Sequence, residues 1–130
     1  RKVGYLAPSV DGHADVVREA LAVAGLSSDS ITLVEAHGTG TAVGDPIEFA
    51  ALTAAFASDR RAACWVGSIQ PHIGHLDTGS GGASRLKAVP ALRHAYQPPL
   101  SRWYVWMVRA VRVPHQSGQI GQSLRRWRSG

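Results

Sequence analysis

The chain has 130 residues, of which 45% are hydrophobic. This length suffices for one buried core but not for a two-domain enzyme, and the sequence lacks the roughly 20-residue apolar run that spans a bilayer. Its single cysteine excludes an internal disulfide framework, and without an N-terminal signal region we expect the reducing cytoplasm as its location. The net charge of +5 belongs to residues 102–130, which carry six arginines and no acid, whereas residues 1–101 carry eight Lys/Arg and nine Asp/Glu.

The first predicted element is a helix that begins at Asp11, with acids in the first turn, where the helix dipole favours them. Gly25 is placed to end this helix. Between the two ends lies a broad apolar stripe, which predicts the buried face: Val16, Val17, Ala20, Leu21, Val23 and Ala24. Residues 31–34 are then predicted as a buried strand that delivers Glu35 to Thr41 at its carboxyl end.

A second helix is predicted to open at Asp45-Pro46, with Asp45 as N-cap and Pro46 at the first helical position. Glu48 is interpreted as a first-turn charge, so that neither acid needs a role in acid/base catalysis. The apolar positions of this helix continue to Phe56.

Residues 63–69 are predicted as a second buried strand, and a third helix is expected over about 82–96. Its inward positions would be Leu86, Val89 and Leu92, and Pro90 predicts a kink or an early stop. The order strand, helix, strand, helix predicts an α/β fold with parallel strands joined by right-handed crossovers.

Each predicted strand is followed by a glycine-containing loop that carries histidine, His37 in the first loop and His75 in the second. In an open α/β sheet, ligands bind outside the carboxyl ends of the strands, so the two imidazoles are expected to converge on one cavity. A neutral imidazole offers one N–H donor, which suits a developing oxyanion on a thioester carbonyl. Thr39 and Thr41 offer hydroxyls that suit an amide-bearing arm. The alternative is two polar loop residues with structural hydrogen bonds.

Over residues 3–100 the chain resembles the C-terminal half of a β-ketoacyl synthase, and most closely the ketosynthase domain of modular polyketide synthases. Several motifs in the same order carry this resemblance, which makes it more specific than a single glycine loop. They are His37-Gly38-Thr39-Gly40-Thr41, Gly44-Asp45-Pro46-Ile47-Glu48, Ile73-Gly74-His75-Leu76 and the closing Pro98-Pro99-Leu100.

The resemblance implies a thiolase-like fold, of which this chain would form the C-terminal part, and a decarboxylative Claisen condensation in polyketide or fatty-acid synthesis. It implies that His37 and His75 promote decarboxylation and stabilise the enolate, and that Thr39 and Thr41 contact the phosphopantetheine arm of an acyl carrier protein. No metal or bound cofactor is implied. The partners would be the carrier protein and either an N-terminal ketosynthase half or a second copy of the chain.

The chain departs from the family at the nucleophile, because the half that carries the family's reactive cysteine is not in this sequence. Cys64 is expected to lie within a strand, with no helix N-terminus to lower its pKa, and so does not replace it. Gln70 stands where the family usually has a lysine, which removes a positive charge from the site. Pro71 and His72 also differ from the residues that are usual in the family.

Residues 1–100 are therefore expected to form the ketosynthase portion and residues 101–130 an irregular, non-homologous basic tail. The expected final strands are replaced after Leu100 by an Arg/Trp-rich sequence whose composition resembles a GC-rich gene read out of frame. The tail is also compatible with a basic binding module, with tryptophans as stacking groups. An unselected extension explains it better, and nucleic acid is not expected as a partner.

We expect the fragment, truncated at both ends, to be inactive alone. The principal alternative is one component of a split ketosynthase, complemented by a separate N-terminal half. In either case an incomplete fold exposes apolar surface that the missing half would cover, so self-association is expected.

Overall fold

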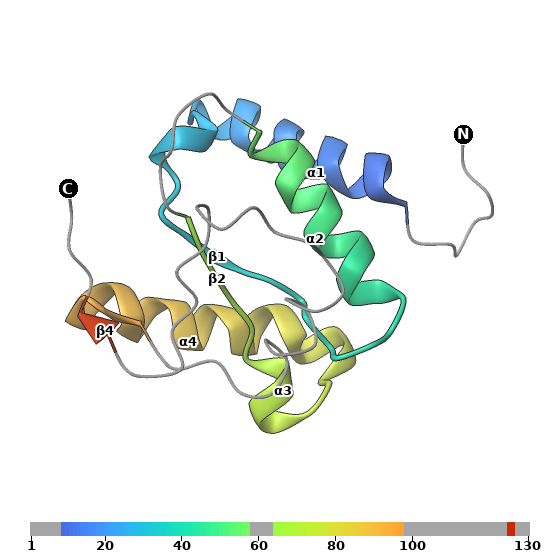
Figure 1. The fold of residues 1–130 in the computed structure, drawn as a ribbon. Helices are drawn as coiled ribbons and strands as arrows, with labels where there is room; N and C mark the ends of the chain where they lie inside the picture. The colour runs from blue at the N-terminus through green and yellow to red at the C-terminus, as the bar shows by residue number, and fades with distance from the viewer. Residues whose placement is uncertain (1–8, 58–63, 98–124, 127–130) are drawn as a thin grey trace.

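The computed structural model describes residues 9–57, 64–97 and 125–126. Two short strands, β1 (Leu33–Glu35) and β2 (Trp65–Gly67), form a parallel pair in which Val34 lies opposite Val66. Figure 1 shows this pair between two helices, α1 (Val10–Ala24) and α2 (Gly44–Ala55), and a third helix, α4 (Ser80–His94). The expected parallel strand–helix–strand arrangement is confirmed.

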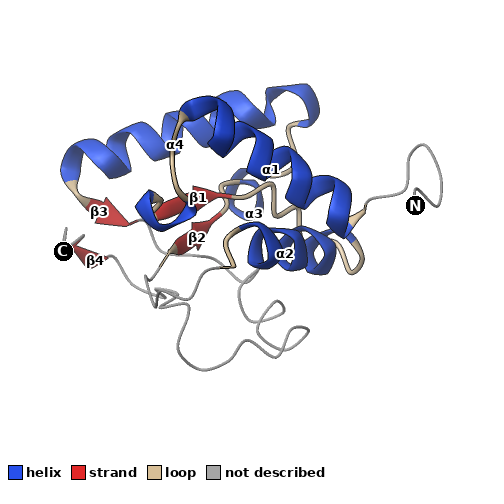
Figure 2. Cartoon of the chain, turned by 90° about the horizontal axis from the view of Figure 1, so that it is seen from above, coloured by secondary structure: helices blue, strands red, loops and turns tan. Residues whose placement is uncertain are grey.

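Shorter elements complete the described residues, and Figure 2, seen from above, labels the short helix and the two short strands among them. They are the 3₁₀ turns η1 (Ser28–Ser30) and η2 (Asp77–Gly79), the short helix α3 (Gln70–Ile73), and the strands β3 (Tyr96–Gln97) and β4 (Arg125–Arg126). The last two pair antiparallel. The predicted tail otherwise lies outside the described residues. Among the residues that the structure describes, no helix is long and apolar enough to cross a membrane.

Helices α1 and α2 pack against each other through small side chains. Ala14, Ala51 and Ala55 are buried together, and such small residues let the two backbones approach closely. The Arg18 guanidinium also donates a hydrogen bond to the Ala54 carbonyl at 3.0 Å, which links the two helices at their surface. The buried contact between α1 and α2 is therefore made mostly of alanine side chains.

Helix α1 begins at Val10, one residue before the predicted start, and ends at the predicted glycine. The Ser9 side chain accepts a hydrogen bond from the Gly12 N–H at 3.3 Å, and Gly25 ends the helix in the left-handed conformation with φ of 65°. The predicted buried stripe is wrong in part, because Val16 is exposed and Val23 is 85% exposed. The stripe is too broad for a helix that packs on one side only.

Both strands are shorter and less buried than predicted. The first begins at Leu33 rather than at residue 31 and includes Glu35, and all three of its residues are half-buried. The second covers only the middle of the predicted range 63–69, and Cys64 precedes it instead of lying within it. Because the ladder continues with the Ala36 N–H donating to the Gly67 carbonyl at 2.7 Å, the two histidine loops begin directly at the strand ends.

Helix α4 presents a different face from the one predicted. Leu86, Val89 and Leu92, expected in the core, are all exposed, Leu86 by 76%. Ala91 is buried instead, and Lys87 reaches β1. The helix also continues past Pro90 for four residues, so of the two predicted effects of this proline, a kink or an early stop, the early stop is wrong.

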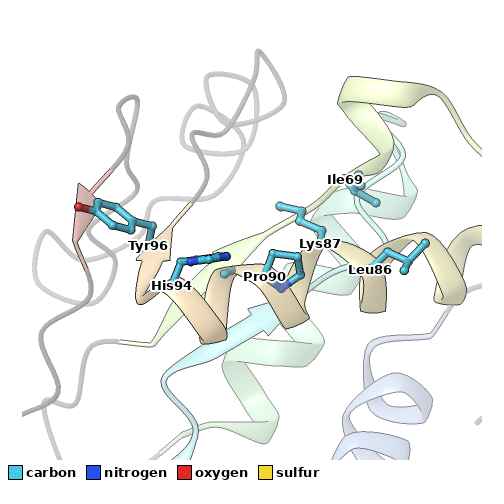
Figure 3. Close-up of a pocket in the computed structure, with 7 residues that line it drawn as sticks. Ile69, Leu86, Lys87, Pro90, His94 and Tyr96 are labelled. Carbon is cyan, nitrogen blue, oxygen red and sulfur yellow. The ribbon is translucent and has the colours of Figure 1, made fainter.

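An apolar pocket of about 460 Å³ lies along α4 near its C-terminal end. Figure 3 shows its lining residues in a row, from Tyr96 and His94 at one end, past Pro90 and Lys87, to Ile69 and Leu86 at the other. Neither predicted histidine lines it. The pocket therefore touches the second histidine loop only at Ile69.

Candidate active site

The first histidine loop is held by two carboxylates of α2. Glu48 accepts hydrogen bonds from the N–H groups of His37, at 2.7 Å, and Gly38, at 2.9 Å. Both N–H groups would otherwise lack partners, because the chain has already left the β1–β2 ladder. Glu48 therefore fixes the backbone that carries the His37 imidazole, a role that its interpretation as a simple first-turn charge missed.

Asp45 holds the following part of the same loop. Its buried carboxylate accepts hydrogen bonds from the N–H groups of Gly40, at 3.0 Å, and Thr41, at 3.3 Å. The prediction that Asp45 is the N-cap of α2 is wrong, because Val43 occupies the cap position and Asp45 lies in the first turn. Its side chain points back to the loop, because without it the N–H groups of Gly40 and Thr41 would be unpaired. Gly40 itself is left-handed, with φ of 82°.

Ser68 joins the two loops. Its hydroxyl is fully buried. It donates to the carbonyl oxygen of His37 at 2.9 Å and shares its proton with that of Gly38 at 3.3 Å. The same hydroxyl oxygen accepts the Gln70 N–H at 3.3 Å. One side chain at the end of β2 therefore fixes the positions of both loops relative to each other.

The two imidazoles that the sequence placed at adjacent strand ends do converge. The ring centroids of His37 and His75 lie 4.9 Å apart, and the ring planes meet at 82°, edge to face. Both residues are exposed, so a ligand has access to the pair. The expected convergence is thus present, with one imidazole from each loop.

Gln70 lies behind this pair and contacts both rings. Its amide nitrogen lies 3.4 Å from His37 Nδ1, and its oxygen lies 3.2 Å from His75 Nδ1 and 3.2 Å from the Leu76 nitrogen. The residue is only 2% exposed. Sequence reasoning identified Gln70 only as the loss of a lysine, yet its side chain contacts both histidines.

Thr39 and Thr41 lie on the His37 loop, Thr39 half-buried and Thr41 exposed. The Thr41 hydroxyl oxygen accepts the Gly44 N–H at 3.1 Å, which leaves its proton available to a ligand. Within the described part of the chain, no three His, Cys, Asp or Glu residues come together as a metal site.

The thiol of Cys64 is poorly suited to nucleophilic attack. Burial raises its pKa above the ordinary value for a thiol, and its sulfur lies 3.8 Å from the Trp65 carbonyl oxygen, to which the S–H can donate. A raised pKa lowers the thiolate fraction at neutral pH, and the thiolate is the reactive form.

Alkylation of Cys64 by iodoacetamide near neutral pH is therefore expected to be slower in the folded chain than in urea, because burial raises the thiol pKa and so lowers the thiolate fraction. Incubation with an acyl thioester should leave the intact mass of the chain unchanged. Stable acylation at Cys64 would contradict this assignment.

The family model for the C-terminal domain of β-ketoacyl synthases matches residues 1–103. A phenolphthiocerol/phthiocerol polyketide synthase protein of Mycobacterium tuberculosis is 44% identical over 100 residues, which are 75% of this chain and 7% of that protein. A mycocerosic acid synthase-like polyketide synthase of Mycolicibacterium smegmatis is 39% identical over 124 residues, 95% of this chain and 5% of that protein. The chain thus spans less than a tenth of these curated relatives.

The fold is also that of solved ketosynthases. Ketosynthase twelve of the bacillaene polyketide synthase from Bacillus amyloliquefaciens superposes with a TM-score of 0.87 and 33% identity, over 99% of this chain and 23% of that one. The expected partial thiolase-like fold is confirmed. The chain belongs to the β-ketoacyl synthase family, and within it to the C-terminal ketosynthase domain of polyketide synthases.

Proposed function

We propose that this chain supplies the two-histidine half of a ketosynthase active site, whose nucleophilic cysteine comes from a region outside this sequence. The observation that carries the proposal is the 4.9 Å approach of the His37 and His75 rings at the ends of adjacent parallel strands. Membership of the β-ketoacyl synthase family supports it. Cys64 does not replace the missing thiol, because its raised pKa keeps it protonated.

The proposed reaction is decarboxylative condensation between two thioesters. Carbon dioxide leaves a malonyl-type extender, and the electron pair of the broken C–C bond forms an enolate. The enolate carbon then attacks the acyl thioester on the cysteine of the N-terminal half, and the thiolate of that cysteine is the leaving group. His37 and His75 would stabilise the negative charge on the enolate oxygen, which is the kind of charge that fixed N–H donors stabilise best.

The extender would be carried by the phosphopantetheine arm of an acyl carrier protein. Thr41 is suited to this arm, because its hydroxyl oxygen is occupied by the Gly44 N–H and its proton is free to donate to an amide carbonyl. Thr39 lies on the same loop, half-buried. These contacts are proposals that follow from the family and from the position of the loop beside His37.

The test is complementation of the missing half. The purified chain is mixed with the N-terminal half of a polyketide ketosynthase that has been acylated on its cysteine, and malonyl-carrier protein is added. Formation of the β-ketoacyl carrier protein, followed by intact mass, is expected only in the mixture. Replacement of His37 or His75 by alanine should lower the rate about 10²–10³-fold, as loss of an oxyanion donor does.

His13→Ala is the matched control, because His13 is an exposed histidine of α1 and is not part of the pair. It should leave the rate of the mixture unchanged. Condensation by the chain alone, or full activity of both active-site variants in the mixture, would refute the proposal.

A further inference from the structure

The orientation of the Gln70 amide is fixed by a backbone group. The Leu76 N–H points at one end of the amide at 3.2 Å, and an N–H can only meet an acceptor, so that end must be the oxygen Oε1. The opposite assignment would place the amide NH₂ against the Leu76 N–H, donor against donor, in a residue that is only 2% exposed. The nitrogen Nε2 therefore faces His37.

This orientation dictates which ring nitrogens carry protons. Oε1 can only accept, so the His75 Nδ1 at 3.2 Å must be protonated. Nε2 can only donate, so the His37 Nδ1 at 3.4 Å must carry a lone pair. We infer that Gln70 is a positioning residue that holds the two neutral imidazoles in opposite tautomers, with the proton on Nε2 of His37 and on Nδ1 of His75.

The pair therefore presents two unlike groups to a ligand. In the neutral state His37 offers an Nε2–H donor, whereas His75 offers an Nε2 lone pair. A hydroxyl group or a water, which donates and accepts at once, matches this state. An oxyanion matches both rings only after His75 has gained a proton at Nε2, because only the imidazolium donates from both nitrogens. This inference deepens the proposed function and rests on it for the chemical use of the pair.

The tautomers can be measured without catalysis. The full 130-residue chain, labelled with ¹⁵N, gives a long-range ¹H–¹⁵N spectrum in which the protonated and unprotonated ring nitrogens have distinct shifts. The spectrum is recorded at about pH 8.5, roughly two units above the reference pKa of free histidine. His75 should show the Nδ1–H pattern, which is the less common form of free neutral imidazole, and His37 the Nε2–H pattern. An Nε2–H pattern at His75 would overturn the inference.

Two variants separate positioning from a general structural role. Gln70→Met removes both bonds with little change of shape, so His75 should return to the Nε2–H form while His37 stays as it is. Gln70→Glu offers only acceptor oxygens, so His37 should gain a proton on Nδ1 while His75 keeps its own. Each variant thus changes a different ring, and the exposed His13 and His94 serve as internal controls.

A variant that folds, by its amide spectrum, and changes neither ring would refute the role of Gln70. If neither variant folds, the spectrum of the unaltered chain still decides the tautomers. The outcome is also separable from the complementation test. If the two rings have opposite tautomers but the mixture forms no product, the inference stands and the proposed function falls. If the rings have the same tautomer and the mixture is active, the inference falls and the proposed function stands.

Discussion

Replacing Lys87 by methionine is expected to lower the free energy of unfolding by about 3–5 kcal/mol, the cost of leaving a buried charge without its partner. The Lys87 ammonium lies 2.9 Å from one Glu35 carboxylate oxygen and 3.2 Å from the other, and the two side chains are only 12% and 9% exposed. This contact joins α4 to β1 from 52 residues away in the sequence. Urea denaturation of the full chain measures the loss.

The matched control is the exposed ion pair of α1, in which Arg18 lies 3.0 Å from Asp15, itself 74% exposed. Asp15→Asn should cost less than about 1 kcal/mol, as exposed pairs do. The double variant Lys87→Met/Glu35→Leu should recover much of the loss, because it removes both charges. A Lys87→Met effect no larger than that of the control would show that solvent reaches the α4–β1 pair.

Replacing Glu48 by alanine is expected to lower the free energy of unfolding by about 3 kcal/mol. It removes two charge-assisted hydrogen bonds, to the N–H groups of His37 and Gly38, and we take each at the lower end of about 1.5–3 kcal/mol because the bond to His37 is exposed to solvent. Because the loop also carries the His37 imidazole, the rate of the complemented mixture should fall about 10²-fold, the usual consequence of a displacement of about 1 Å at a reacting group.

Hydrogen exchange reports the loop directly, since the His37 and Gly38 amides should lose protection in Glu48→Ala before the β1–β2 ladder does. Glu19→Ala, at an exposed glutamate of α1, is the control for loss of an acid from a helix surface. If protection of the two amides survives in Glu48→Ala, the carboxylate is not what holds the loop.

The parts of this structure that depend on local signals were predictable. Gly25 ends α1 because a left-handed residue is needed there, and the two short strands are parallel because a helix separates them in the sequence. The meeting of His37 and His75 follows in turn, since parallel strands end at one edge.

The face of α4 could not be predicted in the same way. Leu86 and Val89 are the apolar choices for a core, but the helix turns Lys87 to β1, because the Glu35 side chain, only 9% exposed, lies there. A buried acid 52 residues away leaves no mark on the local pattern of the helix. The exposed leucine and valine agree with the expectation that a part of this fold leaves apolar surface uncovered.

The side chains that support the site were missed for a related reason. The roles of Asp45 and Glu48 depend on N–H groups of the glycine loop that lie outside the strand ladder. One signal was available: a glycine loop that precedes a helix with two acids among its first five residues. For Gln70, no signal in one sequence indicates an amide between two rings, because its orientation is set by the Leu76 N–H in the folded chain.

The buried hydroxyl of Ser68 couples the His37 loop to the His75 loop. Because it bonds the carbonyl groups of one loop and the N–H of the next, a ligand that pushes one loop outward must break these bonds or carry the other loop with it. If a carrier arm enters beside His37, as proposed, the two loops would keep their spacing while it binds. Discrimination between arms would then depend on their shape, because the loops cannot separate without loss of the Ser68 hydrogen bonds.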